Sequence, residues 1–377
     1  ENMQGGTRKG AGRKPVSDKK QMKNIYLTQR EIDAIDLLEL DDCKNFSQKC
    51  SELIKIGIDT QMNTQKKTTS NDTIKFIDLF AGIGGIRQGF EDKKTECVFS
   101  SEWDKYASQT YEANYSEKPF GDITKIDEKD IPSHDILLAG FPCQPFSHIG
   151  KREGFTHVTQ GTLFFDVLRI LKAKKPKAFL LENVKGLVTH DKGNTLRVII
   201  KSLEEELGYS VFYDILDAQN FGLPQRRERI IIVGFRPDQQ VHTFLFPQGD
   251  SANKVGVGSI LESNPKGYSI SEHLQKSYLF KKDDGRPQII DKDSNIQVNT
   301  LVASYHKIQR LTGTFIKDGD TGLRLYSELE CKRLMGFPDN FEVPVSRTQM
   351  YRQFGNSVAV PMIRAVAQAM KEEIKLK

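Results

Sequence analysis

Six short apolar runs recur along residues 74–235, and helical or polar stretches separate them. They cover residues 74–80, 97–101, 135–139, 178–181, 210–216 and 229–235. Runs of this length and composition are typical of strands buried inside a sheet. Between them, residues 163–174 and 195–207 have the pattern of helices. This alternation predicts an α/β fold with a doubly wound, mostly parallel sheet.

The pattern changes on both sides of this segment. Residues 237–321 are rich in Gly, Ser, Asn and Asp, which predicts a second, irregular domain. Upstream, residues 24–27 form a predicted short strand, Thr28 and Glu31 form a capping box, and Ser47 is the predicted N-cap of a second helix. A strand followed by two helices resembles a ribbon-helix-helix module, which inserts a paired ribbon into the major groove of DNA. The alternative is a small helical hairpin packed on the main body.

Composition and charge limit the classes of protein that fit. No apolar run approaches the roughly 20 residues of a membrane span, and no signal segment opens the chain, so we expect a cytoplasmic protein. The five cysteines include no C-x-x-C pair, which argues against a disulfide framework or a zinc cluster. The net charge of +5 is uneven, because residues 1–30 carry +6 and the other 347 residues sum to −1. This basic head fits either an arm for a polyanion or a solvated tail.

A glycine-rich turn, residues 81–85, follows the first apolar run. Glycines there let backbone N–H groups approach a ligand, although any tight strand-to-helix turn favours glycine. Glu102 follows about twenty positions later, where a carboxylate can bind ribose hydroxyls. Trp103, the only tryptophan, can stack on an adenine, and Asp122 offers a further carboxylate. These residues predict a site for a cofactor that carries a nucleoside.

Cys143 follows the third predicted strand, in the sequence Gly-Phe-Pro-Cys-Gln-Pro-Phe-Ser of residues 140–147. A lone cysteine is more often a buried small hydrophobe than a reactive group. The end of a parallel strand, however, is a suitable place for a nucleophile. Glu182 ends the next predicted strand, and a carboxyl group with a thiolate can attack one face of a ring while protonating it elsewhere. Residues 224–229 add three arginines, as an exposed basic turn or as part of the same site.

Taken in order, these motifs resemble those of DNA cytosine-5 methyltransferases from bacterial restriction-modification systems. The matching blocks are residues 78–85, 140–147, 182–184, 225–229, 329–341 and 353–358. The resemblance covers about four fifths of the chain, from residue 74 to the C-terminus. It implies the fold of S-adenosylmethionine-dependent methyltransferases. It also implies transfer of a methyl group from S-adenosylmethionine to C5 of a cytosine in a specific duplex DNA sequence.

The resemblance implies roles for individual residues. The Cys143 thiolate would add to C6 of a flipped cytosine, Glu182 would contact N3, and Arg227 and Arg229 would line the base pocket. The residues expected to bind the cofactor are Phe80, Gly82, Gly84, Glu102, Trp103, Asp122, Phe141 and Asn356. We expect DNA contacts from Gln144, Ser147, Thr300, Lys307 and Arg310. No metal ion is implied.

The resemblance also suggests a division of the chain and a set of partners. The parts are a basic disordered arm (1–20), a ribbon-helix-helix-like module (21–60), a linker (61–73), a catalytic domain (74–236), a target-recognition domain (237–345) and a C-terminal segment that returns to the catalytic domain (346–377). Double-stranded DNA is the expected partner. A homodimer through residues 23–59 and a cognate restriction endonuclease, without direct contact, are further expectations. The alternatives are a tRNA cytosine-5 methyltransferase and a regulator whose N-terminal module binds an operator.

Overall fold

The computed structural model describes residues 73–142 and 163–374, together with residues 45–54 and positions 27, 32, 35 and 36. Contacts divide the chain into two compact units, residues 1–71 and residues 72–377. In the first unit residues 46–54 are helical, and the Asn45 side chain accepts a hydrogen bond from the backbone N–H of Gln48 at 3.0 Å. Asn45 therefore caps this helix in place of the predicted Ser47. Most of the predicted ribbon-helix-helix module lies outside the described residues.

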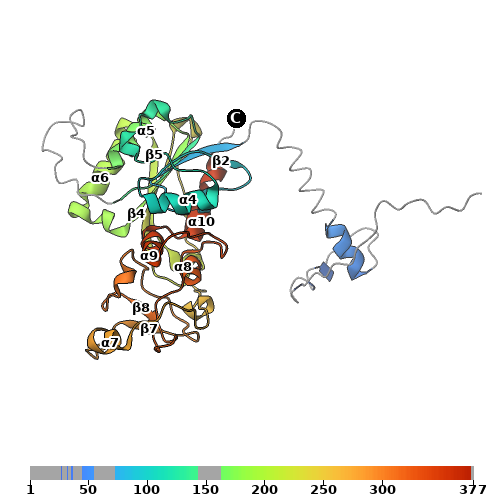
Figure 1. Cartoon of the computed structure of the whole chain (residues 1–377). Coiled ribbons are helices and arrows are strands. Elements are labelled where there is room, and N and C mark those ends of the chain that lie inside the picture. The colour runs from blue at the N-terminus through green and yellow to red at the C-terminus, as the bar shows by residue number, and fades with distance from the viewer. Residues whose placement is uncertain are drawn as a thin grey trace, which may run out of the picture. The chain divides into compact units, whose positions relative to one another are not determined.

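A six-stranded sheet forms the centre of the second unit, with the strand order β2-β1-β3-β4-β6-β5 (Figure 1). The strands are β1 Ile74–Leu79, β2 Thr95–Ser101, β3 Ile136–Gly140, β4 Ala178–Val184, β5 Ser210–Asp217 and β6 Glu228–Phe235. The pairs among β1, β2, β3 and β4 are parallel, whereas β6 is antiparallel to both of its neighbours. All six predicted strands are present, and the predicted mostly parallel α/β fold is confirmed.

Helices cover both faces of the sheet (Figure 1). They are α3 Gly85–Phe90, α4 Lys105–Tyr115, α5 Leu163–Lys174, α6 Asn194–Lys201 and α10 Val360–Glu373. Within β1, Phe76 packs in one apolar cluster with residues of α3 and α10, and Ile77 packs in another with residues of α5 and α6. Successive side chains of a strand point to opposite faces. Because both faces are covered, the strands are continuous apolar runs.

Residues 237–326, called here the irregular region, contain little regular structure. Their strands β7 Gln288–Ile290 and β8 Thr314–Ile316 form a short parallel pair, and α7 spans only Glu272–Leu274. In Figure 1 the helices α8 Glu328–Met335 and α9 Arg347–Asn356 lie between this region and the sheet. Residues of the irregular region, α8 and α9 share one apolar cluster. None of the helices in the described ranges is long and apolar enough to cross a membrane.

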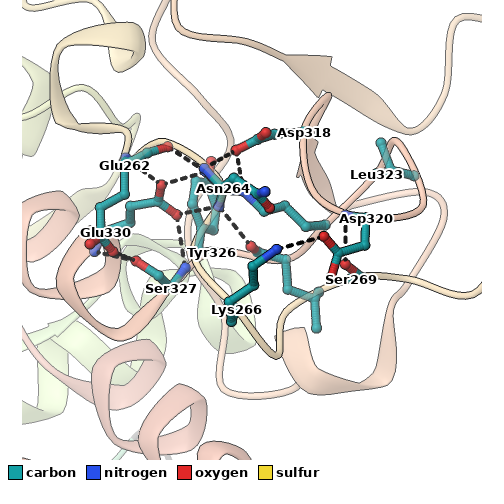
Figure 2. A network of polar contacts seen from close by, with 12 residues as sticks. Glu262, Asn264, Lys266, Ser269, Asp318, Asp320, Leu323, Tyr326, Ser327 and Glu330 are labelled. Carbon is teal, nitrogen blue, oxygen red and sulfur yellow. Dashed lines mark hydrogen bonds and ion pairs between the residues drawn. The ribbon is translucent and has the colours of Figure 1, made fainter.

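A buried polar network joins the irregular region to the start of α8 (Figure 2). Arg324 is fully buried, and its two terminal nitrogens each donate to a carboxylate oxygen of Glu330 at 2.8 Å. Its Nε donates to Asp318 at 3.0 Å. Glu330 also accepts hydrogen bonds from the backbone N–H groups of Glu262 and Ser327, both at 2.8 Å. The network therefore fixes α8 against two separate segments of the irregular region.

Candidate active site

The carboxyl ends of β1, β2, β3 and β4 border one pocket of about 430 Å³. Arg229 of β6 and the residues Gln349 and Asn356 of α9 complete its wall. This volume lies in the range of small-molecule sites. Open parallel sheets bind their ligands at the edge where the carboxyl ends of the strands meet. The pocket is therefore the candidate active site.

The turn after β1 opens onto this pocket at Gly82. Gly82 and Gly84 adopt positive φ angles of 56° and 84°, which glycine reaches without a steric penalty. A Cβ built on Gly82 meets no atom within 4 Å, whereas one on Gly84 lies 2.3 Å from the Tyr115 ring. The Tyr115 hydroxyl donates to the carbonyl of Gly84 at 2.9 Å. Gly82 thus leaves room for a ligand, and Gly84 leaves room for Tyr115.

Glu102, just after β2, is held against the same turn. Its carboxylate oxygens accept hydrogen bonds from the backbone N–H groups of Gly82 at 2.8 Å and Asp104 at 2.7 Å. Burial raises the pKa of Glu102, and these hydrogen bonds only partly oppose the rise. The adjacent Trp103 is 75% exposed, so its ring is open to a ligand. The pair offers an acceptor for ribose hydroxyls and an aromatic face for a base.

Glu182 and Arg229 form an ion pair where β4 and β6 meet in the pocket. Glu182 lies opposite Ile231 and Val184 lies opposite Arg229, so the two charged side chains are diagonal neighbours on one face. The Nε of Arg229 lies 3.0 Å from Oε1 of Glu182. Burial raises the pKa of Glu182, although the positive charges of Arg229 and Arg227 lower it. The result is a buried carboxyl group that keeps a proton more readily than an exposed glutamate.

The chain that leads to Cys143 passes beside Glu182. Gly140 pairs with Glu182 across β3 and β4, and a Cβ on Gly140 would lie 3.5 Å from Oε2 of Glu182. The buried side chain of Asn183 donates to the carbonyl of Phe141 at 2.8 Å. This hydrogen bond ties the segment before Cys143 to the end of β4.

Arg227 borders the pocket, but its guanidinium is bonded to the protein backbone. It is 1% exposed, and its guanidinium donates to the carbonyls of Leu301 at 3.0 Å, Gly355 at 2.9 Å and Ser357. Burial and the nearby positive charge of Arg229 lower the pKa of Arg227 to about 9. Arg227 therefore holds the irregular region and the end of α9 against the sheet, and Arg229 is the arginine that pairs with a carboxylate in the pocket.

Six of the eight residues predicted to bind a cofactor border the pocket in the described part of the chain. They are Phe80, Gly82, Glu102, Trp103, Phe141 and Asn356. Gly84 does not border it, because Tyr115 packs over it. Asp122 does not border it either, since its carboxylate caps a short helix by accepting from the backbone N–H of Thr124 at 3.0 Å. A contact of Asp122 with the cofactor stays a prediction.

The residues predicted to contact DNA fall in different surroundings. Gln144 and Ser147 lie outside the described residues, as does Cys143. Lys307 is exposed. Thr300 is half-buried, and its hydroxyl donates to the carbonyl of Arg226 at 2.5 Å. Thr300 therefore anchors the irregular region to the loop before β6.

Arg310 differs from its predicted contact with a DNA groove, because its side chain is turned into the protein. It is 5% exposed, and its guanidinium donates to the carbonyls of Leu279 at 2.9 Å and Lys282 at 3.0 Å and pairs with Asp284. In return, Arg286 donates to the carbonyl of Leu311 at 3.4 Å. The two arginines clasp residues 279–286 to residues 310–311.

Three side chains of α9 that border the pocket were missed in the sequence. They are Gln349, Arg352 and Gln353. The sequence signal that could have found them is their helical spacing from Asn356, because residues three, four and seven apart share a helix face. They lie far from the strand motifs along the chain, so only the fold brings them to the pocket.

The pocket fits the cofactor that the sequence predicts. The open space over Gly82, the Glu102 carboxylate and the exposed ring of Trp103 suit a nucleoside with an extended side chain. This fold and this pocket define a cofactor-dependent α/β transferase. The chain belongs to the C-5 cytosine-specific DNA methylase family, which matches residues 74–372.

Two relatives match over most of their length. The Type II methyltransferase M.BsuFI of Bacillus subtilis is 64% identical over 403 aligned positions, which cover 99% of this chain and 98% of that protein. The Type II methyltransferase M.MspI of Moraxella sp is 53% identical over 363 positions, which cover 93% of this chain and 85% of that protein. The protein is thus a type II DNA (cytosine-5)-methyltransferase that uses S-adenosylmethionine. The family has DNA as its substrate, which favours DNA over the tRNA alternative.

Solved structures agree with the fold. A mutant of Spodoptera frugiperda DNMT2 gives a TM-score of 0.65 at 21% identity, covering 80% of this chain and 100% of that chain. The S. pombe Dnmt2 methyltransferase gives 0.63 at 20% identity, covering 79% of this chain and 99% of that chain. At such identities the likeness bears on the fold alone.

Proposed function

We propose that the pocket holds S-adenosylmethionine against the β1 turn and Glu102, and a flipped cytosine against Glu182 and Arg229. The observation that carries the proposal is that all of these groups border one cavity of about 430 Å³. A base inside a duplex hides its ring atoms in the stack, so the target must rotate out before it can react. A shared cavity brings the flipped ring and the methyl donor together.

Covalent help is required because C5 of cytosine is a poor nucleophile. We assign this help to Cys143, whose thiolate adds to C6 and moves ring electrons toward C5 and N3. The bound cofactor supplies an electrophilic methyl group. C5 would form the new carbon–carbon bond as the bond between the methyl carbon and the sulfonium sulfur of the cofactor breaks, which leaves a neutral thioether. Loss of the C5 proton to a base, with expulsion of the thiolate, then restores the aromatic ring. The hydrogen bond from Asn183 to the carbonyl of Phe141, two residues before Cys143, supports this assignment.

Glu182 supplies the proton that the ring needs at N3. Its buried carboxyl group has a raised pKa, which supports a protonated form that donates to N3. Arg229, 3.0 Å away, orients this carboxyl group and places a positive charge beside the base. Both groups stabilise the electron density that accumulates on the ring after thiolate addition.

Sequence choice is assigned to the target-recognition domain, residues 237–345. Exposed Lys307 supports DNA binding by this domain, since it can approach a phosphate and set the position of the domain on the duplex. Thr300 and Arg310 contribute by holding the surrounding segments in place. Gln144 and Ser147 are assigned to the DNA side of the catalytic segment.

The test uses a duplex with 5-fluorocytosine at the methylated position, which bisulfite sequencing first identifies. The wild type should become covalently attached to this duplex, because fluorine blocks the final elimination. Cys143→Ser should form no adduct, whereas the matched control Cys97→Ser, altered outside the pocket, should form it normally. Glu182→Gln should lower methylation by about 10²–10³-fold while cofactor affinity is kept. An adduct with Cys143→Ser would refute this mechanism.

We also propose that residues 21–60 bind DNA, with pairing of two chains through residues 23–59 and a role in transcription. The alignment with M.BsuFI over 99% of this chain supports a common origin for this segment and the catalytic part. A cognate endonuclease and a cytoplasmic location complete the proposal. Deletion of residues 1–60 should leave methylation largely intact and remove a second, sequence-specific DNA contact. Loss of methylation in this deletion would contradict the separation of roles.

A further inference from the structure

We propose that Arg352, on α9, binds the α-carboxylate in the methionine half of S-adenosylmethionine. This inference rests on the proposed position of the cofactor in the pocket. It assigns one group of the cofactor to one side chain of α9.

Contacts of other residues place α9 beside the glycine turn and α4. A Cβ on Gly85 would lie 2.4 Å from Oγ of Ser357, so the end of α9 meets the start of α3. The Oε1 of Gln353 accepts from the hydroxyl of Thr110, on α4, at 2.9 Å. Arg352 itself borders the pocket and is exposed. It therefore lies on the helix that packs against the turn and α4.

Arg352 is also the arginine of the pocket that has no partner among the described residues. Arg227 donates to three backbone carbonyls, and Arg229 pairs with Glu182. For Arg352 the described part of the chain shows no hydrogen bond or ion pair. The described residues that border the pocket include no lysine or histidine. Among the described residues, Arg352 is thus the cation that remains for a negative ligand group.

The chemistry of the cofactor supplies a matching group. Glu102 and Trp103 suit its nucleoside end, which leaves the methionine carboxylate for another part of the pocket. The carboxylates of Glu102 and Glu182 would repel this carboxylate, whereas a guanidinium binds it through two parallel hydrogen bonds. Gln349, one turn earlier on the same face of α9, adds an amide that can donate to the same group.

The experiment measures dissociation constants of S-adenosylmethionine and of decarboxylated S-adenosylmethionine by calorimetry, without DNA. Arg352→Met keeps the length of the side chain and removes its charge. We expect this variant to weaken the binding of S-adenosylmethionine about tenfold and to leave the binding of the decarboxylated cofactor unchanged. Arg352→Lys should retain part of the preference for the carboxylate. Arg347→Met, which removes a charge from the same helix outside the pocket, should change neither constant.

Two results would overturn the inference. Equal weakening of both cofactors by Arg352→Met would mean that Arg352 shapes the pocket without contacting the carboxylate. Unchanged cofactor binding with weaker, less salt-dependent DNA binding would assign Arg352 to a DNA phosphate. Glu102→Gln separates this inference from the proposed function, since it should weaken both cofactors alike. If Glu102→Gln weakens neither, the cofactor lies elsewhere and the proposed function itself fails.

Discussion

Arg324 in the irregular region and Asp78 in β1 are both fully buried, yet their surroundings are opposite. Arg324 uses all five of its N–H groups, on Glu330, Asp318 and two backbone carbonyls. The two carboxylate oxygens of Asp78 have no hydrogen-bond partner among the described residues. The paired charge of Arg324 stabilises its region. A charge on Asp78 has no hydrogen-bond partner among the described residues, so it lowers the stability of the folded state.

The difference follows from how each region satisfies its backbone. In the sheet, neighbouring strands pair the N–H and C=O groups, and the core between the layers is apolar. In the irregular region such pairing is limited mainly to the short strands β7 and β8, and buried arginines supply donors to other carbonyls. Arg324 donates to Glu262 and Leu325, and Arg310 donates to Leu279 and Lys282. The sheet needs no such donor at Asp78. The negative charge of Glu102, in the pocket, adds to the rise in the pKa of Asp78 that burial causes.

The largest expected loss of stability comes from breaking the polar network of Figure 2. Arg324→Met leaves the buried carboxylate of Glu330 without its cation, which should cost about 3–5 kcal/mol of the free energy of unfolding. Urea denaturation measures this loss. The double variant Arg324→Met with Glu330→Leu should recover much of it, because no buried charge then remains unpaired. If the double variant is no more stable than the single one, the loss comes from packing and not from the charge.

Asp78→Asn tests the other half of the comparison. Burial raises the pKa of Asp78 from 3.8 to about 7, with Arg87 opposing and Glu102 adding to the rise. The folded state therefore binds this proton more tightly than the unfolded state. The stability that this proton contributes is complete below pH 4 and is lost as the pH rises through 7.

Asparagine has nearly the same shape and carries no charge in this range. Asp78→Asn should therefore be more stable than the wild type at pH 8, by about 4 kcal/mol, and the difference should shrink toward pH 5. Urea denaturation at several pH values checks both statements. If the free energy of unfolding changes with pH in the same way in both proteins, a partner present in solution must stabilise the charged form of Asp78.

The same comparison explains what the sequence predicted and what it did not. The six strands were found because a strand buried on both faces is a continuous apolar run. Glu182 and Glu102 border the pocket, and the sequence pointed to both because they follow such runs at the edge where ligands bind. The backbone contacts of Arg227 and Arg310 were not predicted, since the sequence does not show whether a guanidinium faces solvent or buried carbonyls. Arg352 was missed because only the packing of α9 brings it to the pocket.

The smallest effect on stability is expected for Arg310→Ala, which opens the clasp between residues 279–286 and 310–311. The variant breaks the hydrogen bonds to the carbonyls of Leu279 and Lys282, and water can enter the space that the side chain leaves, so the loss should be about 1 kcal/mol. Because the clasp positions the surrounding segments, we expect discrimination between the target and sites altered by one base pair to fall about tenfold. Methylation of a randomised duplex pool, followed by bisulfite sequencing, measures this ratio.

Lys307→Ala should instead weaken binding to all sequences alike, with a salt slope smaller by about 1. Unchanged discrimination in Arg310→Ala would mean that the clasp serves stability alone.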